Sequence, residues 1–372
     1  MTLLTGFLLV GGLSLIMWPA PVSAGGIKNQ NGKADLTVYG IITRALLYAD
    51  DGKQSALFHV DGSVENTRVG FLMEGRINQE WGIIGQLEHD VGLSNPAGNA
   101  SLGDNGETIS DETAFGIRLA DIGIAHRRLG MFSLGQGDTA STDRVAVDLS
   151  GTDLANNNNP ADMGSGLSFR NTADNARTAT LGDVFDKIDG IDKDDRIRYD
   201  TPEFNGIQAA VSYTDGESVD IGAGWSGEFN GTEIEIGAFY ADYKARDFGT
   251  DDAAYGGSAS VKLENGLSLT LASAVKTSET TGRDDANYLW GKVGYSTGLF
   301  SVGDTHFAIS HGVYNNFGQN DDEATEISLG IVQDLESVGS NIWFLVRNHE
   351  LDRTAQTNDD LLIVSTGVLL NF

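Results

Sequence analysis

The chain has 372 residues, with 24 lysines and arginines against 53 aspartates and glutamates, so its formal net charge is −29. It contains no cysteine, which excludes disulfide bonds, thiolate zinc sites and catalysis by a thiol. The acidic excess argues against a nucleic-acid partner, because phosphate binding needs clustered basic side chains.

The first segment has the pattern of an export signal. Residues 3–18 are almost wholly apolar, two prolines follow, and Val22-Ser23-Ala24 precedes a Gly-Gly pair. This order predicts a signal peptide over residues 1–24, cleaved after Ala24. The alternative, an uncleaved membrane helix, would need about 20 apolar residues. No Lys or Arg precedes the apolar run, which leaves the position of the true start codon open.

After residue 24, apolar and polar residues alternate. In the stretch 207–213 the odd-numbered positions are apolar and share one face, and the same period returns at 219–226, 233–240, 267–272 and 326–331. Strict alternation predicts β-strands. No second apolar run of membrane-spanning length follows, so a helical membrane protein is excluded. A transmembrane barrel remains compatible with the sequence, since only alternate residues of its strands face lipid.

The connections alternate in length. Asn205-Gly206, Asn230-Gly231 and Asn265-Gly266 predict short turns, because Asn and Gly tolerate positive φ. Longer links rich in Asp, Gly and Thr lie between them, for example 244–253 and 276–286. Short turns at one end and long loops at the other are the layout of an outer-membrane barrel.

The pattern therefore predicts an all-β fold, a transmembrane antiparallel β-barrel of about sixteen strands over residues 25–372. A barrel of this size leaves an aqueous channel, and the small polar inner faces predict a wet interior. We expect the terminal Phe372 in the aromatic girdle at the membrane boundary; the alternative is a plain hydrophobic strand end. The strands are expected to begin near Asp35, Val64, Glu80, Arg118, Met131, Asp194, Gly206, Val219, Thr232, Tyr255, Leu267, Asn287, Val302, Thr325, Asn341 and Leu361.

Several stretches resemble the Gram-negative general porins. They are Val38-Tyr39-Gly40, residues 67–71, 118–140 and 196–213, and the terminal Phe372. The resemblance covers essentially the whole mature chain. It implies a homotrimeric barrel in the outer membrane, in contact with its lipid, through which small hydrophilic solutes and ions diffuse passively, with no catalytic residue and no cofactor. It also implies that the third external loop folds into the pore, where its acidic residues face a basic ladder on the wall.

Residues 140–195 are the candidate for this loop, because they form the longest stretch without a strand pattern and exceed ordinary connections in length. Between residues 138 and 195 there are 12 acidic and 5 basic residues. The proline-aromatic-glycine signature of the family's loop is absent. Asp143, Asp148 and Asp153 are the acids expected to stay in water and face Arg68 across the pore. The alternative is a mobile external loop.

Four arginines are candidates for the wall of the pore. Arg68 alternates with apolar neighbours, so its side chain is expected to point inward, and Arg196 and Arg198 share one face of a later strand. By the resemblance, Arg68, Arg118 and one of Arg196 or Arg198 match the basic ladder. Arg118 departs from the alternation, because it has the parity of the apolar residues that follow it in its strand. The alternative for each is a solvated lumen arginine without a special role.

For the other motifs, a structural interpretation is favoured over a functional site. The GAGWSG string at 222–227 matches a dinucleotide fingerprint, but alternation runs through it and no helix follows. The six histidines lack metal-ligand spacing, and we expect no metal site. The acidic run at 183–195 offers oxygen ligands to Ca²⁺, although a solvated acidic link is favoured.

The leading hypothesis is a passive diffusion channel, not an enzyme. A porin specific for sugars or anions is the runner-up, and an outer-membrane enzyme or an adhesive barrel is the alternative from another class. The acidic excess predicts mild cation selectivity, which would weaken as salt rises.

Overall fold

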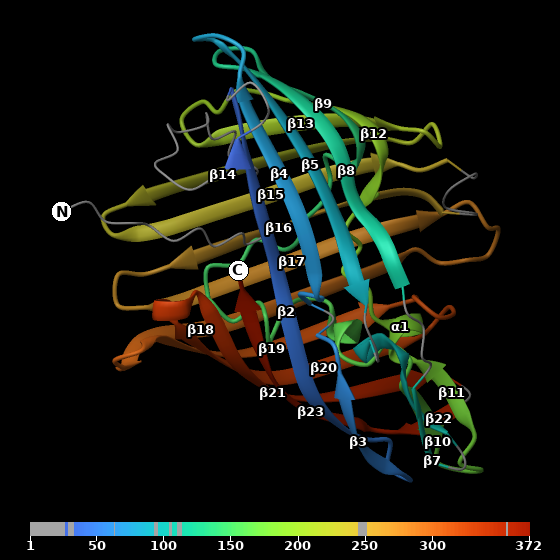
Figure 1. Ribbon diagram of the computed structural model, residues 1–372. Coiled ribbons are helices and arrows are strands. Elements are labelled where there is room, and N and C mark those ends of the chain that lie inside the picture. Colours follow the sequence, from blue (N-terminus) through green and yellow to red (C-terminus); the bar gives the residue numbers. More distant parts are fainter. Residues whose placement is uncertain are drawn as a thin grey trace.

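A computed structural model of the protein describes residues 27–28, 33–62, 64–92, 96–103, 106–109, 114–244, 251–354 and 356–372. The predicted signal peptide lies outside these residues. The described chain forms a closed, sixteen-stranded antiparallel barrel whose strands run obliquely around its axis (Figure 1). Strand β2 (Ala34–Asp50) closes the barrel, because it pairs with β4 (Arg68–Arg76) on one side and with the last strand, β23 (Leu361–Asn371), on the other.

The other wall strands follow in chain order. They are β5 (Trp81–Gly92), β8 (Ala114–His126), β9 (Gly130–Asp138), β12 (Lys193–Asp200), β13 (Ile207–Thr214), β14 (Val219–Phe229), β15 (Thr232–Asp242), β16 (Asp251–Lys262), β17 (Leu267–Ser278), β18 (Ala286–Phe300), β19 (Gly303–Asn315), β20 (Glu323–Leu335) and β21 (Ser340–Arg353). Each begins within about four residues of a predicted start, the usual boundary error. The sixteen-strand prediction is confirmed.

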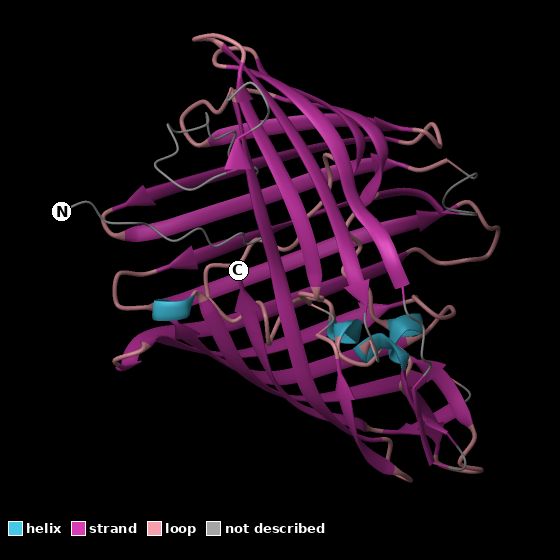
Figure 2. Cartoon of the chain, in the orientation of Figure 1, coloured by secondary structure: helices cyan, strands magenta, loops and turns pink. Residues whose placement is uncertain are grey.

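The remaining elements are short (Figure 2). They are β1 (Ile27–Lys28), β3 (Ser55–Val60), β6 (Ala100–Gly103), β7 (Gly106–Ile109), β10 (Ser168–Asn171), β11 (Arg177–Thr180), β22 (Gln356–Asp359), the helix α1 (Leu181–Val184) and the 3₁₀ turns η1 (Ala97–Asn99), η2 (Pro160–Asp162) and η3 (Glu336–Val338). In the described part of the chain, no helix has the length and apolarity needed to cross a membrane.

Two of the three predicted Asn-Gly turns have the expected backbone conformation, and in the third only Gly266 has a positive φ, of 88°. Asn205 and Gly206 have φ of 52° and 80°, and Asn230 and Gly231 have φ of 51° and 76°. Two consecutive residues at positive φ make the turn that matches the twist of the flanking strands, and Asn followed by Gly is the pair that tolerates it best. These turns therefore set the register of the hairpins that they join.

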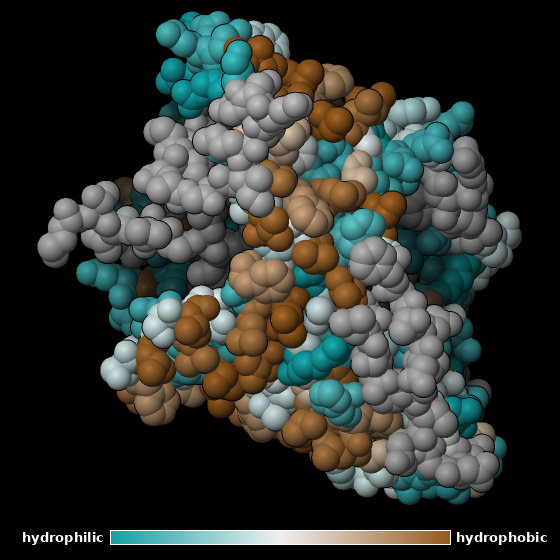
Figure 3. Space-filling view, viewed as in Figure 1, coloured by the Kyte–Doolittle hydropathy of each residue, from teal (hydrophilic) through white to brown (hydrophobic). Residues whose placement is uncertain are grey.

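The outer surface of the barrel is apolar. Large side chains such as Leu57, Leu134 and Leu289 are each 63% exposed. Figure 3 shows apolar side chains gathered in a band over β2, β4, β5 and β8, with polar residues toward both ends. Since alternate residues of a strand point to opposite sides, the outward positions supply this band while the inward ones line the lumen.

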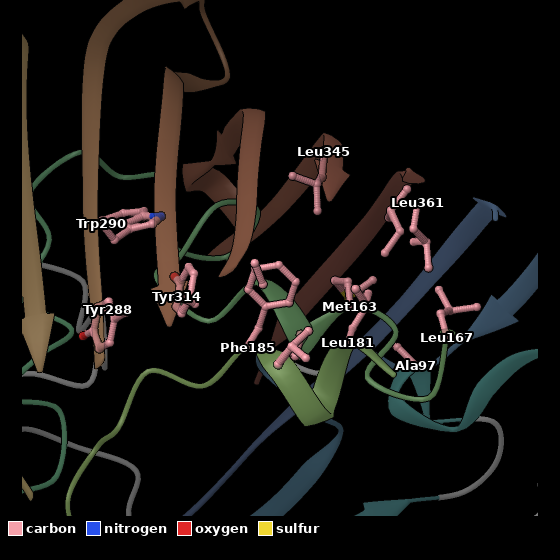
Figure 4. Packing of buried hydrophobic residues seen from close by; sticks show 14 of the residues in the cluster. Ala97, Met163, Leu167, Leu181, Phe185, Tyr288, Trp290, Tyr314, Leu345 and Leu361 are labelled. Carbon is pink, nitrogen blue, oxygen red and sulfur yellow. The ribbon is translucent and has the colours of Figure 1, made fainter. Parts of the chain in front are cut away.

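One side of the interior is dry, which corrects the expectation of a wholly wet lumen. Aromatic side chains of β18 and β19 point inward and pack against the long connection between β9 and β12 (Figure 4). The rings of Tyr288 and Tyr314 stack with centroids 5.3 Å apart, and Phe185 of the connection meets Tyr314 edge-on at 5.0 Å. Large apolar rings occur on the inner face here because a second layer of chain covers them.

The long connection also contributes to the external rim. Its residues 168–180 form the hairpin β10–β11, and β10 pairs with β22, with Arg170 opposite Asp359. These strands lie together at one end of the barrel (Figure 1). The expectation of a strand-free connection was wrong for this part, because β22, the second partner of β10, lies far away in the sequence and leaves no local pattern.

Candidate functional site: the lining of the barrel

The long connection, residues 139–192, turns into the barrel directly after β9. The backbone N–H of Ala140 donates to Ser212 Oγ at 2.8 Å, and that of Ser141 donates to Asp220 Oδ2 at 2.7 Å. Gly222 permits this approach, because a Cβ there would lie 1.9 Å from the carbonyl oxygen of Ala140. The first residues of the connection are therefore held against the inner faces of β13 and β14.

The connection then crosses the inner wall strand by strand. Val147 N–H donates to Ser258 Oγ on β16 at 3.0 Å, and Leu149 N–H donates to Ser260 Oγ at 2.9 Å. Farther along, Arg347 on β21 donates to the carbonyl oxygen of Pro160 at 3.0 Å. Small hydroxyl side chains on the inner face thus satisfy backbone groups of the connection that would otherwise be buried without partners.

Lys292 on β18 is the main charged anchor of this segment. Its ammonium donates to Asp148 Oδ2, to the carbonyl oxygen of Asn156 at 2.7 Å and to Thr152 Oγ1 at 3.3 Å. The side chains of Lys292 and Asp148 are 0% and 5% exposed. Asp148 was expected to face the pore, but it points to the wall instead. The Lys292 ammonium holds the pKa of the Asp148 carboxyl below its ordinary value, against the opposing effect of burial.

Asp153 lies in the segment that Lys292 holds and differs from Asp148. It is half-buried, and among the described residues it has no hydrogen-bond or ion-pair partner. Its enclosure within the barrel raises its pKa to about 7, and the neighbouring Asp148 charge adds to this effect. Of the three predicted loop acids, Asp153 is the one without a direct partner among the described residues.

Asp143 lies near the point where the connection returns to the wall. Lys187 Nζ is 3.4 Å from Asp143 Oδ1 and 2.8 Å from Asp189 Oδ2. Burial raises the pKa of the Asp189 carboxyl to about 7, although Lys187 opposes this shift. Asp143 is therefore part of a local cluster of charges and is paired within its own loop.

Arg68 and Arg118 meet at one carboxylate on the opposite wall. Glu88 on β5 accepts a hydrogen bond from Arg118 Nη1 at 2.6 Å, and its second oxygen lies 3.6 Å from Arg68 Nε. A second acid, Glu65, is paired with Arg68 Nη2 at 2.5 Å. The side chain of Glu88 is 3% exposed, that of Arg68 is 9% and that of Arg118 is 26%. Arg68 points inward, as its alternation predicted.

A β-bulge explains how Arg118 joins this group. Glu88 pairs with Leu119 and the next residue, His89, pairs with Ile117, so Arg118 is an extra residue in the ladder. The bulge reverses the parity on one side of it, and Ile117 is 60% exposed on the outer surface. Arg118 therefore turns inward, although its parity with the later apolar residues of β8 would place it outside.

Arg196 and Arg198 support the start of the long connection. Arg196 Nη2 is 2.7 Å from Asp121 Oδ2, and Arg198 binds Asp200 with Nη2 at 2.7 Å. Both guanidinium groups also donate to the carbonyl oxygen of Asp138 at 3.0 Å. The two arginines are 6% exposed. They are buried in ion pairs beneath the loop and reinforce its attachment to the wall.

The C-terminal residue closes the seam of the barrel. The backbone of Phe372 exchanges two hydrogen bonds with Gly40 on β2, at 3.0 and 3.1 Å. The ring lies over Gly40, because a Cβ at this position would be 2.4 Å from Phe372 Cζ. Phe372 is 62% exposed. The Phe372 ring therefore packs on the outer face of the seam, where Gly40 has no side chain.

The acidic run at 183–195 makes separate contacts. Asp183 caps α1 by accepting from Thr180, Asp189 pairs with Lys187, and Asp192 pairs with Lys193 at 2.9 Å. Within the part of the chain that the structure describes, no three His, Asp or Glu side chains are arranged to hold a metal ion.

Two residues of the site escaped the sequence reasoning. Glu88 has the inward parity of its strand, so alternation could have singled it out. Lys292 has the inward parity of β18 next to large aromatic residues, and a lysine among them is a signal of a buried partner. Neither residue lies in a motif.

The comparisons with known proteins agree with this architecture. A family model for the Gram-negative porins matches residues 14–339. Among curated proteins, none matches the chain in sequence. Similar solved structures include an anion-selective porin from Comamonas acidovorans, with 15% identity and a TM-score of 0.60, covering 91% of this chain and 100% of that one.

Two further structures have the same fold. The outer-membrane channel DcaP of Acinetobacter baumannii has 11% identity and a TM-score of 0.58, covering 94% of this chain and 100% of its own. OmpF of Salmonella typhi, solved with daunomycin, has 14% identity and a TM-score of 0.55, covering 93% and 100%. At such identities the likeness concerns the fold alone.

Proposed function

The chain belongs to the Gram-negative porin family and lies in the outer membrane, and on this basis we propose that it is a passive diffusion channel for small hydrophilic solutes and ions. The main support is the path of residues 139–192, which pack against the inner faces of β13 to β21 and occupy that side of the lumen. The channel runs between this inner layer and the wall that carries Arg68, Glu88 and Arg118. The inner layer sets the exclusion size.

We further propose the homotrimer that the family resemblance implies. One similar structure, an outer-membrane protein of Vibrio cholerae with 14% identity and a TM-score of 0.53, was solved in a trimer form. Cross-linking of the purified protein in detergent should give a ladder that stops at three subunits. A ladder that ends at one subunit would contradict this assembly state.

The experiment that tests the channel is single-channel recording in planar bilayers. The purified, folded protein should give large, stepwise conductance increments, in groups of three if it is a trimer. Liposome swelling with a series of neutral sugars should show uptake that falls sharply with sugar size. Silent bilayers from protein that remains a compact barrel on unboiled gels would overturn the proposal.

A sugar-specific channel is less well supported. Such a channel would expose a row of aromatic side chains to the solute, but the inward Tyr288, Trp290 and Tyr314 are only 1–2% exposed beneath the long connection. Their hydrogen bonds are also committed: Tyr314 OH donates to the carbonyl oxygen of Asn158, and Trp290 donates to Glu326. They stabilise the inner layer.

A catalytic function is also less well supported, although a serine, a histidine and an aspartate do meet. His306 Nδ1 is 2.8 Å from Ser296 Oγ and its Nε2 is 3.1 Å from Asp334 Oδ2. In a serine hydrolase the serine contacts Nε2 and the aspartate contacts Nδ1. Ser296 also donates to the carbonyl oxygen of Ser150 at 3.2 Å. This group is better suited to hold the connection than to act as a nucleophile.

We also propose that residues 1–24 are removed on export, with cleavage after Ala24. The apolar run and the small residues before Gly25 support this. N-terminal sequencing of the protein from outer membranes should begin at Gly25, and a sequence that begins at Met1 would contradict it.

A further inference from the structure

The arginines of the wall are compensated by acids of the same wall. Arg68 is paired with Glu65 and Glu88, and Arg118 shares Glu88. Five further cations of the wall strands are also paired. Their pairs are Arg196–Asp121, Arg198–Asp200, Lys193–Asp138, Lys292–Asp148 and Arg347–Glu326.

This pairing weakens the electrostatic potential that acts on a solute in the channel. An arginine with a carboxylate about 3 Å away acts as a dipole, and its potential falls with distance faster than that of a free charge. Glu88 is the critical member, because each of its two oxygens faces a different arginine and 3% of its side chain is exposed. One carboxylate therefore reduces the field of two guanidinium groups.

The opposite side of the passage carries acids without a direct ion-pair partner among the described residues. Asp153 is half-exposed in the inner layer and has no partner among the described residues. Glu235 on β15 is a second inward acid for which the structure describes no hydrogen-bond or ion-pair partner. Free carboxylates opposite neutralised arginines make the lumen attractive to cations.

We infer that Glu88 is a selectivity-determining residue. Its carboxylate largely neutralises the charges of Arg68 and Arg118. The channel therefore favours small cations, including organic ones with an ammonium or guanidinium group. This inference rests on the proposed channel function and adds the class of solute. It differs from a general effect of net charge, because it assigns the preference to one buried carboxylate.

The test is the reversal potential across a KCl gradient for the whole protein in planar bilayers. The wild type should be more permeable to K⁺ than to Cl⁻ at low salt, where the Debye length is about 10 Å at 0.1 M. Glu88→Gln should lower this permeability ratio at least about threefold, because it frees Arg118 of its carboxylate and leaves Arg68 with Glu65 alone, close to the ion path. The matched control is Glu233→Gln on the exposed part of β15, which removes the same charge but releases no arginine and should shift the ratio much less.

Two further variants keep the test decisive. Glu88→Gln combined with Arg118→Gln should restore most of the wild-type ratio. Arg118→Gln alone should raise the ratio, and it provides the measurement if Glu88→Gln does not fold. Liposome swelling should be faster with lysine than with glutamine and slowest with glutamate. Glu88→Gln should reduce the difference in swelling rate between lysine and glutamate.

The outcomes separate the two proposals. Channels that prefer Cl⁻, or equal shifts for Glu88→Gln and Glu233→Gln, would overturn the role of Glu88 while leaving the channel intact. A wild-type protein that forms no channel would overturn the proposed function itself.

Discussion

Lys292 and Asp148 form an ion pair between a wall strand and the inner layer, and both side chains are almost fully buried. The same ammonium holds two further groups of residues 148–156. One side chain of β18 thus makes three contacts with the segment that carries Asp153, in addition to the hydrogen bonds with Ser260 and Ser296. The position of this segment in the lumen depends on these contacts more than on any local preference of the loop.

Replacing Lys292 by Met should detach this segment. It leaves a buried carboxylate without its partner, which costs about 3–5 kcal/mol. We expect frequent transient closures or sublevels in single-channel records, since the segment can then move within the lumen. The double variant Lys292→Met, Asp148→Asn should show fewer transient closures and sublevels than the single variant. Equally steady records from the single variant and the wild type would refute the anchoring role.

The selectivity should depend on pH through Asp153. Its pKa is raised to about 7, so it is largely ionised at pH 8 and loses its charge as the pH falls through 7. We therefore expect the K⁺/Cl⁻ permeability ratio to decrease between pH 8 and pH 5.5. Asp189 has a pKa of about 7 as well, but it is buried and paired with Lys187. Asp153→Asn should remove most of the pH dependence, and a dependence that persists unchanged would assign it elsewhere.

The same pKa has a consequence for stability. Because the folded state binds the proton of Asp153 more tightly than the unfolded chain, this residue stabilises the fold progressively as the pH falls from about 7 toward 3.8. Asp153→Asn should therefore stabilise the protein at pH 8 but have little effect near pH 4. The urea midpoint of unfolding at the two pH values measures this difference. A uniform shift at both values would contradict it.

Deleting residues 151–161 should widen the pore. The deletion removes the contacts of Asn156, Asn158 and Pro160 with the wall, including the hydrogen bond from Arg347. Conductance and the size limit for sugars should both increase. Removing residues 279–282 from an exposed external link is the matched control and should change neither. Unaltered conductance in a properly folded deletion variant would disprove the constricting role.

Gly40→Ala should weaken the barrel at its seam. The added Cβ would lie 2.4 Å from the ring of Phe372 and 2.7 Å from the carbonyl oxygen of Arg68. A misfit of this kind costs about 1–3 kcal/mol. Gly116→Ala is the control, because its Cβ would meet nothing within 4 Å. The temperature at which the compact band on gels is lost should fall for Gly40→Ala only.

The parts of the fold set by local chemistry could be predicted from the sequence. Alternation and the Asn-Gly turns locate the wall strands, because each strand has one lipid-facing side and each short turn needs positive φ. Arg118 shows where this reasoning fails. A bulge depends on the register with β5, and nothing in the residues around Arg118 reveals that one position is skipped.

The loop acids could be identified but not oriented. Asp143, Asp148 and Asp153 look alike in sequence, yet only the third lacks a partner among the described residues. The difference comes from Lys187, which is 44 residues from Asp143, and from Lys292, which is 144 residues from Asp148. Tertiary pairing across such distances decides which carboxylates stay charged and free, and the local sequence carries no record of it.

The pairing of β10 with β22 joins the inner layer to a segment about 190 residues later, immediately before β23, the strand that pairs with β2. Contacts between residues so far apart form late in folding, because the intervening chain must first be ordered. The passage should therefore acquire its final width only as the barrel closes.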